Sequence, residues 1–92
     1  MYLSIIIPVW NEAGKIIDDI REVERFSERY KIPVELIIAD DGSNDHTSQI
    51  AKDISTIKSV KKIVIGDSIH RGKGHAVRQG IIRSTGELVM FM

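Results

Sequence analysis

The chain has 92 residues, of which 42% are hydrophobic and 28% are charged, and its formal net charge is zero. These values indicate one globular domain of ordinary composition, and the absence of cysteine excludes a disulfide framework and thiolate chemistry. No apolar run approaches the roughly 20 residues that span a bilayer, and the start lacks the basic segment of a signal peptide, so we expect a cytoplasmic protein.

The first half of the chain predicts two strands and one helix. LSIIIPV, at 3–9, is a β-branched run closed by a proline, which predicts a buried strand. Apolar residues then recur at helical spacing, so we expect a helix at 12–30 with Asn11 as its N-cap. KIP ends this helix, and VELIIAD, at 34–40, predicts the second strand.

The second half repeats the alternation of strands and helices after the polar turn DGSND. We expect a helix with Ile50, Ala51, Ile54 and Ile57 on one face, a strand at 61–66, a helix at 75–84 that stops at Gly86, and a strand at 87–92. This order predicts an α/β fold in which a parallel sheet is covered by helices on both faces.

Unusual residues follow each of the first three predicted strands, in the segments PVWNE, DDGSND and HRGKG. In parallel sheets, ligands bind at the carboxyl ends of the strands, where these three loops meet. Two common nucleotide motifs are excluded. No G-x-G-x-x-G follows the first strand, and GDSIHRGKG fails the spacing of a P-loop and lacks its Ser or Thr.

A phosphate site in the loop before the third helix is still compatible with the sequence. Gly72 and Gly74 let backbone N–H groups approach an anion, and the N-terminus of the following helix adds its positive end. Arg71 and Lys73 supply full charges. The alternative is a flexible glycine loop with solubilising basic residues. The local excess of basic residues at 61–83 is too small to predict nucleic-acid binding.

Asp40 and Asp41 have three interpretations: metal ligands together with Asp45, a capping cluster for the second helix, or acceptors for an N–H group of a ligand. Strand alternation points the two carboxylates to opposite sides, which disfavours joint coordination of one ion. One carboxylate should therefore face the cleft and the other the turn.

The aromatic side chains near these loops are ambiguous. Trp10 could belong to the core, or its ring could stack on a nucleobase at the mouth of the site. His70 and His75 are interpreted as solvent-facing loop residues. No catalytic triad or acid–base pair can be assembled from the sequence.

The three loops taken together resemble a known family. SIIIPVWNE, ELIIADDGSNDHT and HRGKGHAVRQG, in this order and spacing, resemble the N-terminal half of family 2 glycosyltransferases, and the segment that ends in GELVMFM is most similar to dolichyl- or polyprenyl-phosphate glycosyltransferases. The resemblance implies a three-layer, Rossmann-like GT-A domain with sheet order 3-2-1-4. It also implies a UDP- or GDP-sugar donor, Mg²⁺ or Mn²⁺, and inverting transfer to a lipid phosphate at the cytoplasmic membrane face.

The resemblance also assigns the candidate site. It implies that the nucleotide sugar is bound by Pro8, Val9, Trp10, Glu12, Asp40, Asp41, Arg71, Gly72 and Lys73. In this assignment the first loop lines the base and ribose, and Asp41 accepts a hydrogen bond from the base with Asp40 beside it. The segment from Arg71 to Lys73 lies along the ribose and diphosphate. Trp10 replaces the usual tyrosine, and His46 stands where the family more often has glycine.

One departure from the family concerns the metal. The Asp-x-Asp that follows the fourth strand in the family is absent from this chain, and the half that carries the catalytic base is absent too. We therefore expect residues 1–92 to be the nucleotide-sugar-binding half, truncated before that motif, with no transferase activity and no tightly held metal. The apolar strand at 87–92 would form a sheet edge, so we expect a homo-oligomer through it.

The sequence leaves two alternative functions: a non-catalytic nucleotide-binding module, and a nucleotidyltransferase-like domain. The second would need a glycine- and arginine-rich loop after the first strand, where only Gly14 and Lys15 are present. The sequence does not distinguish uracil from guanine, glucose from mannose, or a lipid from a saccharide acceptor.

Overall fold

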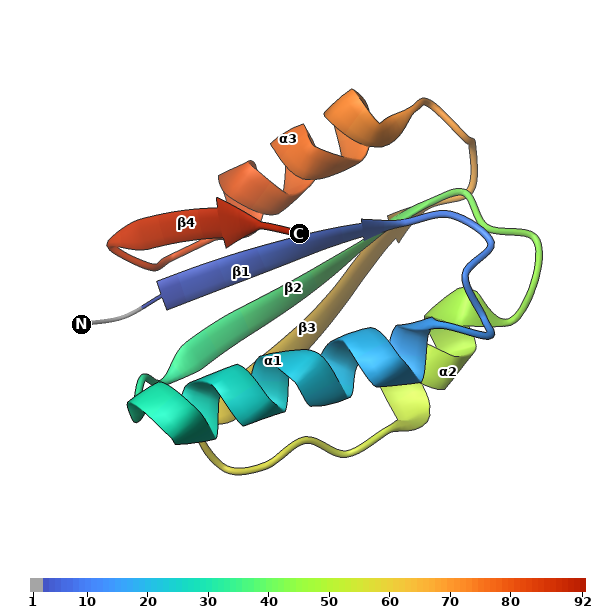
Figure 1. Ribbon diagram of the computed structural model, residues 1–92. Helices are drawn as coiled ribbons and strands as arrows, with labels where there is room; N and C mark the ends of the chain where they lie inside the picture. Colours follow the sequence, from blue (N-terminus) through green and yellow to red (C-terminus); the bar gives the residue numbers. More distant parts are fainter. Residues whose placement is uncertain (1–2) are drawn as a thin grey trace.

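The computed structural model describes residues 3–92, in which strands and helices alternate as predicted (Figure 1). The elements in chain order are β1 (Leu3–Val9), α1 (Ile16–Tyr30), β2 (Val34–Asp41), α2 (Thr47–Asp53), β3 (Val60–Asp67), α3 (Lys73–Arg83) and β4 (Leu88–Phe91).

The four strands form one parallel sheet in the order β3-β2-β1-β4, which confirms the predicted order 3-2-1-4. In the register of the sheet, Val9 is paired with Asp40, and Asp40 is paired with Gly66. The carboxyl ends of β1, β2 and β3 therefore lie level with one another. The loops that follow them are brought to the same edge of the sheet.

The sheet has a helical layer on each face, with α1 and α2 on one side and α3 on the other (Figure 1). Strand alternation separates the two packing clusters. Ile5, Ile7 and Leu36 belong to the larger cluster with α1, whereas Ile6 and Ile37 belong to the smaller cluster beneath α3. Both faces of β1 and β2 are buried, which explains why their sequences are continuously apolar.

The start of the first helix differs from the prediction. Helix α1 begins at Ile16, and Asn11 is not its N-cap. The backbone of Asn11 has φ 51°, in the left-handed region that asparagine tolerates better than most residues. Asn11 instead contacts the loop after β2, so its amide side chain has a tertiary role that helix periodicity could not reveal.

The remaining helices are short. Helix α2 has seven residues and ends before Ile54 and Ile57, which nevertheless pack against the larger cluster. Helix α3 begins at Lys73, two residues earlier than predicted. Within residues 3–92, no helix has the length and apolar character needed to cross a membrane.

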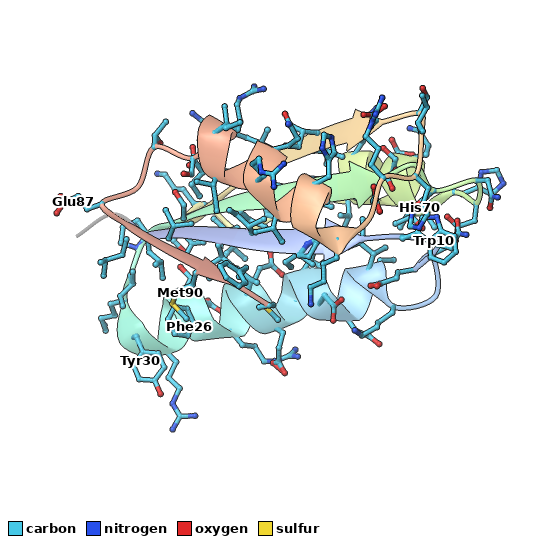
Figure 2. All side chains as sticks on the ribbon, turned by 90° about the horizontal axis from the view of Figure 1, so that it is seen from above. Trp10, Phe26, Tyr30, His70, Glu87 and Met90 are labelled. Atoms are coloured by element: carbon cyan, nitrogen blue, oxygen red, sulfur yellow. The ribbon has the colours of Figure 1, made fainter. Side chains whose placement is uncertain are left out.

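Strand β4 lies at one edge of the sheet, and among the described strands it pairs only with β1. All four of its residues are exposed, although all four are apolar. A groove of about 520 Å³ runs beside it on the α1 side, where Met90 lies near Phe26 and Tyr30 (Figure 2). The predicted apolar edge is therefore present.

Candidate functional site

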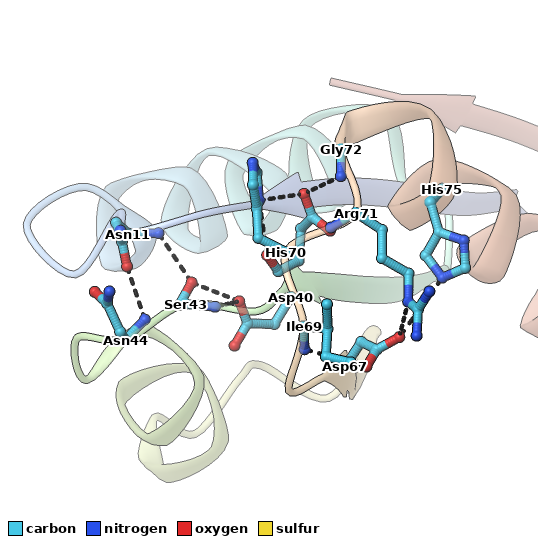
Figure 3. Close-up of polar contacts among 11 residues, drawn as sticks. Asn11, Asp40, Ser43, Asn44, Asp67, Ile69, His70, Arg71, Gly72 and His75 are labelled. Carbon is cyan, nitrogen blue, oxygen red and sulfur yellow. Dashed lines mark hydrogen bonds and ion pairs between the residues drawn. The ribbon is translucent and has the colours of Figure 1, made fainter.

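The loops that follow β1 and β2 are held together by side chains. The backbone N–H of Asn11 donates to Ser43 Oγ at 2.9 Å, and the backbone N–H of Asn44 donates to Asn11 Oδ1 at 2.9 Å (Figure 3). These two reciprocal hydrogen bonds fix the chain directly after Trp10. The position of the Trp10 ring thus depends on residues more than thirty positions later.

A second pair of contacts continues this connection. The backbone N–H of Glu12 donates to Oγ1 of the buried Thr47 at 2.9 Å, and the backbone N–H of Ala13 donates to Asp45 Oδ2 at 3.2 Å. Asp45 also accepts hydrogen bonds from the hydroxyl and the backbone N–H of Thr47, and the hydroxyl bond is the main reason that its pKa lies below the ordinary value. Asp45 therefore lies at the start of α2, as expected for a capping residue, although the N-cap position itself is His46.

Asp40 and Asp41 point in different directions, as strand alternation predicted. Asp40 Oδ1 accepts hydrogen bonds from the backbone N–H and the hydroxyl of Ser43, so this carboxylate closes the turn after β2 (Figure 3). Asp41 instead faces the loop that follows β3. Both residues are buried. One ion cannot be held by the pair in this arrangement.

Asp41 is bonded to the backbone at the start of α3. Its Oδ1 accepts the N–H of Arg71 at 2.8 Å, and its Oδ2 accepts the N–H of Gly72 at 2.8 Å. A carboxylate at this position satisfies free N–H groups and lies at the positive end of the helix. The N–H of Gly72, which the sequence suggested for an external anion, is thus bonded to an anion of the protein itself.

His70 completes the surroundings of Asp41. Its Nδ1 lies 2.8 Å from Asp41 Oδ2 and 3.1 Å from the backbone oxygen of Asp41. The imidazole also stacks on Trp10, with ring centroids 4.3 Å apart and an angle of 26° between the rings (Figure 2). His70 is exposed, as expected for a loop residue, since 49% of its side chain is accessible, but the imidazole also has specific contacts with Asp41 and Trp10.

Most of the predicted site residues line one hollow. A cavity of about 190 Å³ is lined by Pro8, Val9, Trp10, Glu12, Asp41, His70 and Lys73. A neighbouring hollow of about 370 Å³ shares Pro8, Glu12 and Lys73, and it also contacts Lys15. The two hollows share three lining residues and together form a surface depression at the end of β1, of which only the first part also contacts β2, through Asp41.

Two other predicted residues, Asp40 and Arg71, do not line this depression. They line a cavity of about 290 Å³ with Asp67 and His75, and Asp41 lies between this cavity and the hollow that contains Trp10. Arg71 Nε donates to Asp67 Oδ2 at 2.9 Å (Figure 3), and this bond, followed by one from the N–H of Ile69, holds the pKa of Asp67 below the ordinary value. The guanidinium is therefore directed towards Asp67, away from the hollow that contains Trp10.

The described carboxylates do not fit a divalent cation. Within residues 3–92, no three Asp, Glu, His or Cys side chains are arranged to hold a metal ion. Asp40 and Asp41 diverge, and both already accept hydrogen bonds from their own chain. We therefore derive no step of a reaction through a metal on these residues.

Comparison with known proteins identifies the family. The model of the family described as "Glycosyl transferase family 2" matches residues 4–92. The chain belongs to glycosyltransferase family 2. The family resemblance and the GT-A fold predicted from the sequence are thereby confirmed.

Several family members can be compared along nearly the whole chain. The chain is 36% identical over 96 residues to the dolichyl-phosphate beta-glucosyltransferase of Saccharomyces cerevisiae, covering 99% of this chain and 29% of that protein. It is also 36% identical over 92 residues to the glycosyltransferase AglE of Haloferax volcanii, again covering 99% and 29%. The chain thus spans less than a third of the length of these relatives.

A solved mannosyltransferase structure has a similar fold. The mannosyltransferase PcManGT from Pyrobaculum calidifontis, determined in complex with GDP-Man and Mn²⁺, superposes with a TM-score of 0.77 at 28% identity, covering 95% of this chain and 25% of that one.

Three features of the site were not predicted from the sequence: the contacts of His70, the ion pair of Asp67 and the contacts of Asn11. The contacts of His70 and Asn11 join loops that follow different strands, whereas Asp67 and Arg71 lie four residues apart, at the end of β3 and in the loop after it.

Proposed function

We propose that this chain is the donor-binding part of an inverting family 2 glycosyltransferase. The donor would be a UDP- or GDP-sugar, and the acceptor of the whole protein a dolichyl or polyprenyl phosphate. The single observation that carries the proposal is the hollow at the ends of β1 and β2, which collects Pro8, Val9, Trp10, Glu12, Asp41 and Lys73 in a member of this family. The membrane location of such an acceptor would place the whole protein at the cytoplasmic membrane face.

In this proposal the base lies near Trp10 and the diphosphate near Lys73. The Trp10 side chain is large, flat and 47% exposed, which suits stacking on a base. Lys73 lines both parts of the depression, so its ammonium group can reach a diphosphate that extends from one part into the other. Asp41 would accept an N–H of the base, with Asp40 holding the adjacent turn. Gly72 would lie beside the ribose and diphosphate, and Arg71 would contact them after its guanidinium leaves Asp67.

The carboxylates of residues 3–92 do not fit a divalent cation. We propose that a whole protein of this kind uses Mg²⁺ or Mn²⁺ held by carboxylates outside residues 3–92. The complex of PcManGT contains Mn²⁺, which supports a divalent cation as the general partner of the donor in this family. The described residues would bind and orient the nucleotide without transferring the sugar.

Titration calorimetry of the 92-residue chain with UDP, GDP, UDP-glucose and GDP-mannose tests the proposal. We expect one base to be preferred, and we expect Trp10→Ala and Lys73→Ala each to weaken binding by about tenfold, the effect of losing about 1.4 kcal/mol. Lys58→Ala is the matched control, because this lysine is exposed and lies outside the depression. Equal affinity for all variants, or no binding of any nucleotide, would reject the assignment of the site.

We also propose that the chain self-associates through β4. A strand edge exposes backbone N–H and C=O groups that pair most readily with another strand, and a second copy supplies one with the same sequence. The side chains of Leu88, Met90 and Phe91 are each at least half exposed and would be covered in such a pair. An isologous contact of this kind closes as a dimer.

A further inference from the structure

His70 makes two contacts that resemble those proposed for the nucleobase. The imidazole is a flat ring stacked on Trp10, with 4.3 Å between the ring centroids. The same ring places a nitrogen 2.8 Å from Asp41 Oδ2. Because a carboxylate only accepts hydrogen bonds, this nitrogen must carry the proton. A base bound in the proposed way would likewise be a flat ring with an N–H directed at Asp41.

The donors around Asp41 differ in how easily they can be replaced. Two of them are the backbone N–H groups of Arg71 and Gly72, which directly precede α3. These N–H groups cannot leave Asp41 unless the backbone of the loop moves. The third is the imidazole of His70, on a side chain that is 49% exposed. Rotation about its side-chain bonds would release the ring into solvent, so His70 is the donor that a ligand can displace.

Asp41 lines two cavities, and only the hollow that contains Trp10 is also lined by His70. A ligand that approaches Asp41 from this hollow competes with His70. The side chain of Asp41 is only 4% exposed, and His70 forms part of the wall of the hollow that contains Trp10. A base could stack on the open face of Trp10 without moving His70, but it would then not contact Asp41. The two possibilities lead to opposite effects of removing the imidazole.

We propose that His70 is a gating residue that occupies the base subsite in the free protein and is displaced when the nucleotide binds. This inference rests on the proposed donor-binding function, and it adds that the imidazole of His70 competes with the nucleobase for Asp41. The apparent affinity for the nucleotide would then equal the intrinsic affinity multiplied by the fraction of molecules in which the ring has left Asp41. His70 would also favour bases that present an N–H to Asp41, because only these replace the hydrogen bond that is lost.

Nucleotide titration of His70→Ala tests the gate. We expect His70→Ala to bind UDP or GDP about two- to tenfold more tightly than the natural sequence, a factor typical of one stacked aromatic contact. His46→Ala is the matched control, because His46 is an exposed histidine that does not line the hollow, and its affinity should equal that of the natural sequence. Unchanged or weaker binding by His70→Ala would show that the imidazole is a bystander or part of the binding platform, and the gate would be rejected.

Two spectroscopic readouts follow the ring in the unmodified chain. On saturation with the nucleotide, the ¹H and ¹⁵N NMR signals of the His70 ring should move towards those of an imidazole in water, whereas an undisplaced ring would keep its signals and refute the proposal. The chain has a single tryptophan, so the fluorescence of Trp10 should change in both His70→Ala and the nucleotide complex. If neither the natural chain nor His70→Ala binds a nucleotide, both the proposed donor-binding function and the gating role of His70 are rejected. If both bind a nucleotide with equal affinity, only the gating role is rejected.

Discussion

Glu35 accepts two hydrogen bonds from Thr85, a residue 50 positions later in the chain. The backbone N–H of Thr85 donates to Oε1 at 2.9 Å, and its hydroxyl donates to Oε2 at 3.0 Å. Ser4 Oγ donates to the same carboxylate at 2.8 Å and accepts the backbone N–H of Gly86 at 2.9 Å. This partly buried network joins β1 and β2 to the turn that precedes β4.

Glu35→Ala should destabilise the fold. Removal of the carboxylate leaves the hydroxyl of the buried Ser4 and the N–H of Thr85 without their acceptor, which should lower the free energy of unfolding by about 2–3 kcal/mol. Chemical denaturation monitored by circular dichroism measures the change. Glu28→Ala, on the exposed side of α1, is the control and should change stability by no more than about 0.5 kcal/mol. Similar values for both variants would contradict a structural role for Glu35.

The same carboxylate should make stability depend on pH. Burial raises the pKa of Glu35, but hydrogen bonds from Thr85 and Ser4 and the charge of Lys61 outweigh burial, so the pKa in the folded state is below the ordinary value. A lowered pKa in the folded state contributes stability that is fully present above the ordinary glutamate pKa of about 4.3 and is lost as the pH falls below it. Unfolding curves measured from pH 7 to pH 3 should therefore converge for the natural sequence and Glu35→Gln at the acidic end. A constant difference across this range would argue against the linkage.

Gly42 should not accept a side chain. Its φ is +73°, and a Cβ at this position would lie 2.5 Å from the backbone nitrogen of His70. We expect Gly42→Ala to cost about 2 kcal/mol or more, because strain in the left-handed region adds to a contact with backbone that must move. Gly14→Ala is the matched control, since no atom lies within 4 Å of a Cβ there. Thermal unfolding compares the two, and nucleotide titration shows whether displacement of the loop at His70 also weakens the site.

Thr47→Val should loosen the first loop. Valine has a similar shape but removes the hydroxyl that accepts the N–H of Glu12 and donates to Asp45. We expect a loss of about 1–3 kcal/mol in the free energy of unfolding, together with weaker nucleotide binding because Trp10 and Glu12 share that loop. Thr47→Ser keeps the hydroxyl and should restore most of both properties. Failure of serine to restore binding would mean that the methyl group, and not the hydrogen bonds, determines the effect.

Met90→Lys should weaken self-association through β4. Met90 is half exposed and lines the groove beside α1, so a charge at this position would have to be desolvated in a pair of chains. Sedimentation velocity over a range of concentrations should show dimers for the natural sequence and mainly monomers for the variant. Ile69→Lys places the same charge on an exposed apolar residue outside the strand and should leave the dimer intact. A natural chain that stays monomeric at high concentration would refute the β4 contact.

Much of the architecture was predictable because it depends on periodicity. Continuous apolar runs mark β1 and β2, which are buried on both faces, and the alternation of strands with helical spacing leads to a parallel sheet. Alternation along β2 also separates the directions of Asp40 and Asp41 without any tertiary information. The helix boundaries were less accurate, since Asn11 was expected at the start of α1 but lies in a loop.

The sequence predicted which residues of the site lie at the carboxyl ends of the strands, but not which contacts their side chains make. Placing PVWNE and DDGSND at the same edge follows from parallel topology alone, and six of the residues proposed from the sequence line one hollow: Pro8, Val9, Trp10, Glu12, Asp41 and Lys73. Arg71 could not be placed in this way. Its long side chain turns to Asp67, four residues earlier, and that choice depends on how the loop after β3 is folded.

The sequence by itself therefore determined the parallel sheet, from short-range patterns, and the family, from motifs read in order. The sheet order 3-2-1-4 was implied by the resemblance to that family. The tertiary structure alone decided the partners of each polar side chain in the site. Hydrogen bonds require atoms within about 3 Å, and Asp41 meets the N–H groups of Arg71 and Gly72 only when separate loops have folded against one another. The stacking of His70 on Trp10 arises in the same way, between rings that lie sixty positions apart in the chain.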